Sequence, residues 1–196
     1  DARSATMRTD SELVVTVSGV FCTGSIYCNP VPTVNSLNLD GTVRTSMNLY
    51  PETMDKVWSV AVQPDGGFVM VGGAPLVAVV TAFTPSMNVR FRRAQPTESY
   101  TTGFQGVDLQ RDGKILAWGE YPPYLARLSA DGIPDGSRFN SSTGSVFTAA
   151  IQANGDVILG RGSAPYLTRL VGDRLSGPPL IREQPHRQEW IVGQPA

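Results

Sequence analysis

The sequence predicts an all-β protein of four tandem units, each with about four antiparallel strands, arranged as a β-propeller or a propeller sector. Three observations lead to this prediction. Turn dipeptides recur at a near-constant interval, apolar residues alternate with polar ones between the turns, and glycine and proline are abundant, at 20 and 15 of 196 residues. Because these turn formers are interleaved with short apolar runs, they indicate frequent chain reversals and not a disordered tract.

The recurring turns are Asp65-Gly66, Asp112-Gly113 and Asn154-Gly155, which lie 47 and 42 residues apart. Each follows the pattern apolar-x-apolar-Gln and precedes an apolar strand, as in VAVQPDGGFVMVGG. A more divergent first copy begins at Asp10-Ser11. Repeats of this length are typical of propeller blades.

Asp-Gly or Asn-Gly between apolar runs predicts β-hairpins with type I′ turns, in which both central residues have positive φ. In the third unit we expect strands at about 104–110, 114–119, 124–130 and 137–140, with apolar side chains on both faces, as in a sheet packed between two others. In the second unit, Thr84-Pro85-Ser86 replaces the second Asp-Gly. The pattern therefore does not fix the geometry of that hairpin.

These turns divide the chain into a repeat domain and a tail. The expected boundaries are a repeat domain at 1–177, with units at about 1–55, 56–103, 104–145 and 146–177, and a linker or extended tail at 178–196. Four blades are the low end of the usual propeller range. We favour an incomplete ring, whose exposed terminal face would require another chain or a second copy of this one.

Charge and hydropathy argue against a nucleic-acid partner and against a membrane span. The formal net charge is -1, from 16 basic and 17 acidic residues scattered along the chain. No basic patch of the kind that binds nucleic acid stands out. No run of about 18 apolar residues is present, so we expect no membrane span. The chain begins at Asp1 without an initiating Met, which suggests a processed chain or a fragment.

The two cysteines, Cys22 and Cys28, lie six residues apart in a segment rich in turn formers. A chain reversal there would bring them within disulfide range, and a loop-closing disulfide indicates an oxidising, extracellular or cell-surface location. The alternative is a pair of free thiols in a reducing compartment.

The segments VWSVAVQPDGGFVMVGG, GVDLQRDGKILAWG and LARLSADGIPDGSRFN resemble the delta-sixty repeat, a propeller-type repeat of large secreted or surface proteins of bacteria. The resemblance spans about 11–177 and is weakest in the second unit. The tail PPLIREQPHRQEWIVGQPA is similar to the opening of an immunoglobulin-like domain, of which it could supply only the first strands. The resemblance implies a piece of a multidomain surface protein.

Several candidate sites compete with structural explanations. Asp131 and Asp135 in SADGIPDGS are the nearest candidates for a calcium site, but aspartate before glycine also stabilises turns. His186, the single histidine, lies in the tail, which argues against a histidine-based catalytic triad within the repeats. Gly160-Arg161-Gly162 lacks the helix and lysine of a phosphate-binding loop and is interpreted as a strand end.

Carboxylate chemistry is open, with Glu98, Asp108 and Glu120 as candidates, although ordinary acidic residues on a propeller surface are the better explanation. Arg127-Leu128 and Arg169-Leu170 occupy matching positions, which favours a role in blade packing over ligand contact.

Three aromatic residues form a candidate ligand platform, namely Trp118, Tyr121 and Tyr124 around the Pro122-Pro123 corner. Such rings stack on carbohydrate. The alternative is that Trp118 and Tyr124 pack between blades while Tyr121 lies alone on a loop.

These observations lead us to expect a non-catalytic extracellular binding, adhesion or scaffold module without a cofactor, with a protein or carbohydrate ligand. The first alternative is a subunit that self-assembles through its C-terminal tail. The second is a polysaccharide-active enzyme, which rests on fold-level analogy alone.

Overall fold

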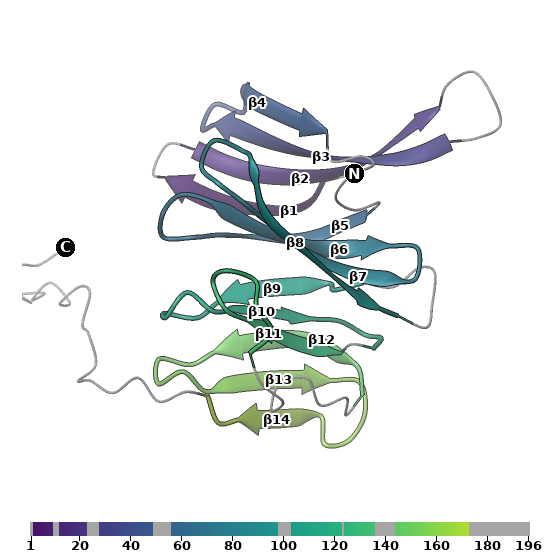
Figure 1. The fold of residues 1–196 in the computed structure, drawn as a ribbon, viewed down its shortest axis with the longest axis vertical. Helices are drawn as coiled ribbons and strands as arrows, with labels where there is room; N and C mark the ends of the chain where they lie inside the picture. The colour runs from purple at the N-terminus through teal and green to yellow at the C-terminus, as the bar shows by residue number, and fades with distance from the viewer. Residues whose placement is uncertain are drawn as a thin grey trace, which may run out of the picture.

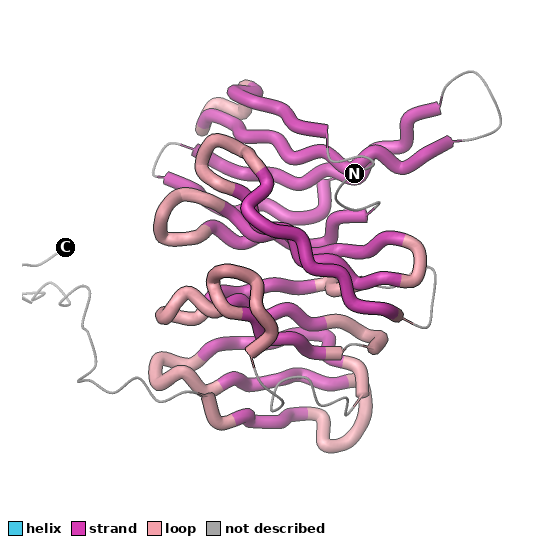
Figure 2. The backbone as a smooth tube through the Cα atoms, viewed as in Figure 1, coloured by secondary structure: helices cyan, strands magenta, loops and turns pink. Residues whose placement is uncertain are grey.

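The structure is a computed structural model that describes residues 2–9, 12–22, 28–48, 56–97, 103–122, 124–135 and 144–172. These residues form four separate antiparallel sheets that follow one another in chain order, and Figure 1 shows them stacked from the purple first sheet to the yellow-green fourth. The described residues contain no helix, as the tube in Figure 2 makes plain. The all-β prediction of four tandem units is confirmed.

Within each sheet, strands that are consecutive in the chain are also neighbours. The first sheet contains β1 (Ala2–Thr9), β2 (Glu12–Cys22), β3 (Cys28–Asn38) and β4 (Val43–Asn48). The second contains β5 (Lys56–Val62), β6 (Phe68–Ala74), β7 (Val77–Phe83) and β8 (Val89–Pro96). The third contains β9 (Gly106–Leu109), β10 (Ile115–Trp118) and β11 (Leu125–Leu128). The fourth contains β12 (Val146–Ile151), β13 (Val157–Arg161) and β14 (Leu167–Leu170). The expected fourth strand of unit three, at 137–140, and the tail at 178–196 lie outside the described residues.

Hairpin turns of one kind recur six times. In each turn, the residue before the loop makes two backbone hydrogen bonds. In the turn at Gln63, for example, the Gln63 N–H donates to the Gly67 carbonyl at 2.8 Å, and the Gln63 carbonyl accepts the N–H of Gly66 at 2.9 Å. Within these six turns, the residues with positive φ are Gly41, Gly66, Met87, Gly113, Gly132 and Gly155. Only one residue of each turn has positive φ, so the type I′ prediction is wrong. The turns are three-residue loops in which a type I turn is followed by a left-handed residue.

In three of these turns, an aspartate side chain accepts a hydrogen bond from a backbone N–H of the same turn. The Asp65 carboxylate accepts the N–H of Gly67 at 2.9 Å, and Asp112 and Asp40 accept N–H groups two residues on in the same way. In the second unit the hairpin that lacks Asp-Gly adopts the same turn, with Met87 at φ 64° in the place of the glycine.

The core consists of the interfaces between successive sheets. Side chains alternate along each strand, so one set faces the preceding sheet and the other faces the following sheet. Phe68 and Phe83 stack at 4.9 Å and pack with Val14 and Val34 of the first sheet. Further clusters join the second sheet to the third and the third to the fourth. The innermost strands β1, β5, β9 and β12 contact one another in series. Each sheet is thus a blade, and the four blades form a propeller sector.

Candidate functional site

A groove runs along the inner strands of the first three blades. It encloses about 430 Å³ and is lined by Thr6, Met7, Val60, Ala61, Val62, Val107, Asp108 and Leu109. Each of β1, β5 and β9 is an end strand of its sheet. Within the described residues, the backbone groups along one side of each of these strands therefore have no strand partner. Two of them have side-chain partners instead: the Val60 N–H donates to the Ser4 hydroxyl at 3.3 Å, and the Leu109 N–H donates to Asp108.

The repeat explains which side chains line the groove. Val60 and Val62 pack against the interface with the first blade, whereas Ala61 between them packs against the third. In the next blade Val107 and Leu109 pack back against the second. Asp108 lies between them on the opposite side of β9, with Oδ1 accepting the N–H of Leu109 at 2.8 Å.

Among the described residues that line the groove, Asp108 alone has an ionisable side chain. Counted from the repeated glutamine, its position is held by Ala61 in the second blade and Ala150 in the fourth. A departure from the repeat at one copy is the expected signature of a local function imposed on a packing pattern. This departure is visible in the sequence: the second residue is aspartate in VDLQ and alanine in both VAVQ and AAIQ.

Of the candidate carboxylates for glycoside chemistry, the two in the described residues, Asp108 and Glu120, lie toward opposite ends of β10. Asp108 lies toward the turn that joins β9 to β10, and Glu120 lies beyond the other end of β10. The Glu120 carbonyl accepts the Ser145 hydroxyl at 2.7 Å. Glu98 lies outside the described residues, as does His186.

The three aromatic residues of the predicted platform are placed differently from one another. Trp118 and Tyr124 are partly buried and pack against the cluster between the third and fourth blades. The Trp118 indole lies so close over Gly106 that a Cβ there would come within 2.2 Å of it. Tyr121 is 49% exposed on the loop. A ligand role for the platform remains a prediction.

Of the two aspartates that the sequence offers as candidates for a calcium site, Asp135 forms ion pairs in the structure. Asp135 pairs with Arg127 at 2.9 Å and with Lys114 at 3.1 Å, and Asp131 is exposed on its turn. Among the described residues no group of three or more histidine, cysteine or acidic side chains could hold a metal ion.

The Arg-Leu pairs occupy matching positions in the third and fourth sheets, opposite Leu116 and Ile158. Arg169 donates to Asp156, which also accepts the N–H of Gly172 at 3.0 Å. These bonds, the Gly172 N–H foremost and then the Arg169 guanidinium, hold the pKa of Asp156 below its usual value. Gly160-Arg161-Gly162 is the end of β13 and the residue after it, as predicted.

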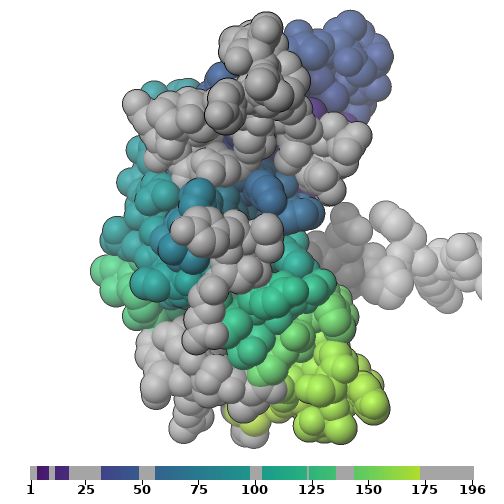
Figure 3. Space-filling model, turned by 90° about the vertical axis from the view of Figure 1, so that its right-hand side faces the viewer, coloured from purple at the N-terminus to yellow at the C-terminus, as the bar shows by residue number. Residues whose placement is uncertain are grey.

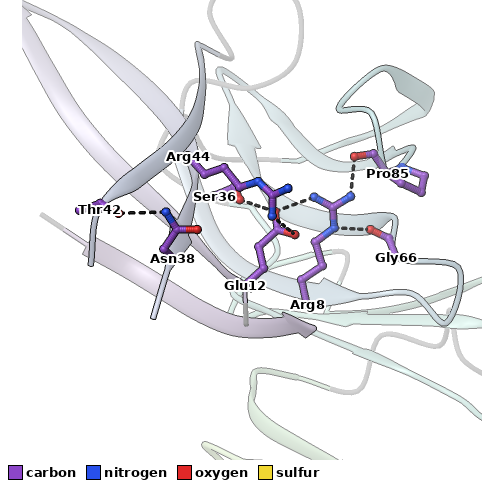
Figure 4. Close-up of polar contacts among 8 residues, drawn as sticks. All are labelled: Arg8, Glu12, Ser36, Asn38, Thr42, Arg44, Gly66 and Pro85. Carbon is purple, nitrogen blue, oxygen red and sulfur yellow. Dashed lines mark hydrogen bonds and ion pairs between the residues drawn. The ribbon is translucent and has the colours of Figure 1, made fainter. Parts of the chain in front are cut away.

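A partly buried polar clamp joins the first blade to the second. The Arg8 guanidinium donates to the Glu12 carboxylate at 2.9 Å, to the Gly66 carbonyl at 2.7 Å and to the Pro85 carbonyl at 2.5 Å. Figure 4 shows Arg8 reaching from beside Glu12 to both turns of the second blade. The Ser36 hydroxyl donates to Glu12 from the neighbouring strand, where the sequence pattern gave no sign of a polar interior. Sequence reasoning missed this clamp.

The cysteines lie where β2 ends and β3 begins. In the register of β2 with β3, Cys22 and Cys28 are directly opposite each other. Cα atoms of directly opposed residues in an antiparallel pair are about 4.5–5.5 Å apart, within the range that a disulfide spans. The register is compatible with the predicted disulfide, which remains a prediction.

Four blades in series, with a groove along the inner strands of the first three, define the chain as a β-propeller-type sector. Comparison with solved structures agrees. The chain is similar to a virginiamycin B lyase from Staphylococcus aureus, with a TM-score of 0.62, 12% identity, and coverage of 88% of this chain and 53% of that one.

A streptogramin B lyase structure gives a TM-score of 0.57 at 13% identity, covering 86% of this chain and 53% of that one. A protein of unknown function from Bacteroides caccae gives 0.58 at 15%, covering 87% of this chain and 57% of the other. The chain thus spans about half the length of these structures. At such identities the likeness shows the fold alone. No family model and no curated protein matches the sequence, so the resemblance to the delta-sixty repeat is confirmed only as a propeller-type fold. No helix in the described part of the chain is long and apolar enough to cross a membrane.

Proposed function

We propose that the chain is a non-catalytic binding module of a secreted or surface protein, and that it binds an extended, basic segment of a protein ligand in the inner-strand groove. The observation that carries this proposal is Asp108, a carboxylate in a groove whose other described lining residues are uncharged, at a position that two other blades fill with alanine.

The groove offers two kinds of contact that suit an extended peptide. End strands present backbone donors and acceptors, which give affinity when a peptide aligns with them. The carboxylate then selects for a positive charge, because a lysine or arginine that pairs with it forms a charge-assisted hydrogen bond. Apolar side chains of the ligand would pack on Met7 and Leu109.

Fluorescence polarisation with two labelled decapeptide pools tests this proposal. The pools have equal apolar content, and they carry either arginine or glutamine at the central position. We expect the full chain to bind the arginine pool more tightly, and Asp108→Asn to weaken that binding about tenfold, the loss expected for one charge-assisted bond.

Asp131→Asn is the matched control, since Asp131 is an exposed aspartate on a turn outside the groove. Equal binding of both pools, or equal loss in the two variants, would refute the proposal. An array of neutral oligosaccharides serves as a parallel probe: binding there that survives Asp108→Asn would instead favour a carbohydrate ligand.

A further inference from the structure

The outward face of the fourth blade has the side-chain pattern of a blade interface but no following blade among the described residues. In the pairing of the second and third strands of each blade, Leu167 holds the position of Leu125 in the third blade and Val80 in the second. Leu125 and Val80 are 5% and 1% exposed, whereas Leu167 is 72% exposed. Figure 3 shows the yellow-green fourth sheet at the end of the stack.

Polar residues of this face show the same contrast. Gln110 is buried and donates to the Gly155 carbonyl of the following blade at 3.3 Å, whereas the equivalent Gln152 is exposed. The Arg127 side chain is 6% exposed and that of Arg169 is 56% exposed. Each of these fourth-blade side chains thus holds an interface position without the burial that the earlier blades give it.

The opposite end of the sector is complementary. In the first blade, Val14 and Val34 face the second blade and are fully buried. Leu13 and Val15 alternate with Val14 along β2 and therefore face away from the second blade, where both are only partly buried. The first blade thus presents an apolar backward face, as every later blade does to the blade before it.

We propose that two copies of this chain close a ring head to tail, the forward face of the fourth blade of each copy packing on the backward face of the first blade of the other. Eight blades lie within the range of known propellers. The contact continues the interface that already joins the blades within one chain, and a ring with two-fold symmetry leaves neither face open.

Sedimentation velocity of the full chain from about 1 to 100 μM tests the proposal. We expect a dimer at the upper concentrations. Leu167→Glu on the forward face and Val15→Glu on the backward face should each raise the dimer dissociation constant at least a hundredfold. Leu39→Glu is the matched control, since Leu39 is 67% exposed on a turn outside both faces. Circular dichroism checks that each variant is folded.

Mixing the two face variants gives the decisive result. Each variant alone has a damaged face in both contacts of the ring, whereas a mixed pair has one contact in which both faces are intact. The mixture should therefore associate more tightly than either variant alone. A wild-type chain that is monomeric at 100 μM, a dimer that Val15→Glu leaves unchanged, or a mixture no tighter than its components would overturn head-to-tail closure. None of these results depends on peptide binding in the groove.

Discussion

The clamp between the first two blades gives the sharpest prediction about stability. Arg8→Ala removes three hydrogen bonds and leaves the Glu12 carboxylate without its nearest cation, although the side chains of Arg8 and Glu12 are only 11% and 10% exposed. Breaking one side of a buried ion pair costs about 3–5 kcal/mol, because the remaining charge keeps its desolvation cost. Glu12 still accepts the Ser36 hydroxyl, so we expect a loss of about 3–4 kcal/mol in the free energy of unfolding.

Arg44 provides the matched control. It is 3.8 Å from the other Glu12 oxygen, and its side chain is 61% exposed. Exposed pairs of this kind contribute at most about 1 kcal/mol. Arg8→Lys keeps the charge but has no fork of donors with which to reach both turns, so its stability should fall between wild type and Arg8→Ala.

Urea unfolding followed by far-ultraviolet circular dichroism measures all three variants. Equal losses for Arg8→Ala and Arg44→Ala would refute the clamp as a link between the blades. A stability of Arg8→Lys equal to that of wild type would refute the role given to the two turn carbonyls.

Three further predictions concern two turn glycines, the Asp156 carboxylate and the two cysteines. Gly113 and Gly132 both have positive φ, at 84° and 78°, but only at Gly132 would a Cβ meet a ring, 2.5 Å from Phe91. Gly113→Ala should therefore cost about 1 kcal/mol for backbone strain alone, and Gly132→Ala should cost at least twice as much in the same urea titration; equal costs would contradict the packing of Phe91 on that turn. Asp156 has a lowered pKa, so the stability it contributes is present above the unfolded-state pKa of about 3.9 and is lost as the pH falls through its folded-state value. Wild type should accordingly lose stability between about pH 5 and 3 more steeply than Asp156→Asn in thermal melts, and parallel curves would count against this explanation. Cys22 and Cys28 should resist alkylation until a reductant is added, as read by intact mass, and two alkyl groups on the unreduced folded or denatured chain would exclude the disulfide.

The sequence was sufficient to predict the blades because the repeat copies the same turn many times. Gly66, Gly113 and Gly155 mark the first turn of three blades, and each has the positive φ that glycine adopts readily, so the turns are recognisable from local sequence alone. The type I′ assignment was wrong because the dipeptide alone does not distinguish a two-residue loop from a three-residue loop. That choice depends on strand register, which is set by tertiary packing.

The clamp and the groove were harder to predict for a different reason. Arg8, Gly66 and Pro85 are far apart in the sequence and meet only when two blades pack together. Arg8 and Glu12 look like ordinary surface charges in a single sequence. Asp108 was recognised as a candidate carboxylate, but its position beside β1 and β5 follows from the order of the inner strands and not from any local motif.

A crystal structure of the full chain tests the central claim most directly. We predict that β1, β5, β9 and β12 will lie side by side in that order, with each sheet packed face to face on the next and Asp108 in the groove along them. A structure in which the first sheet packs on the fourth within one chain, or in which strands of different units pair edge to edge in a common sheet, would contradict the open propeller sector.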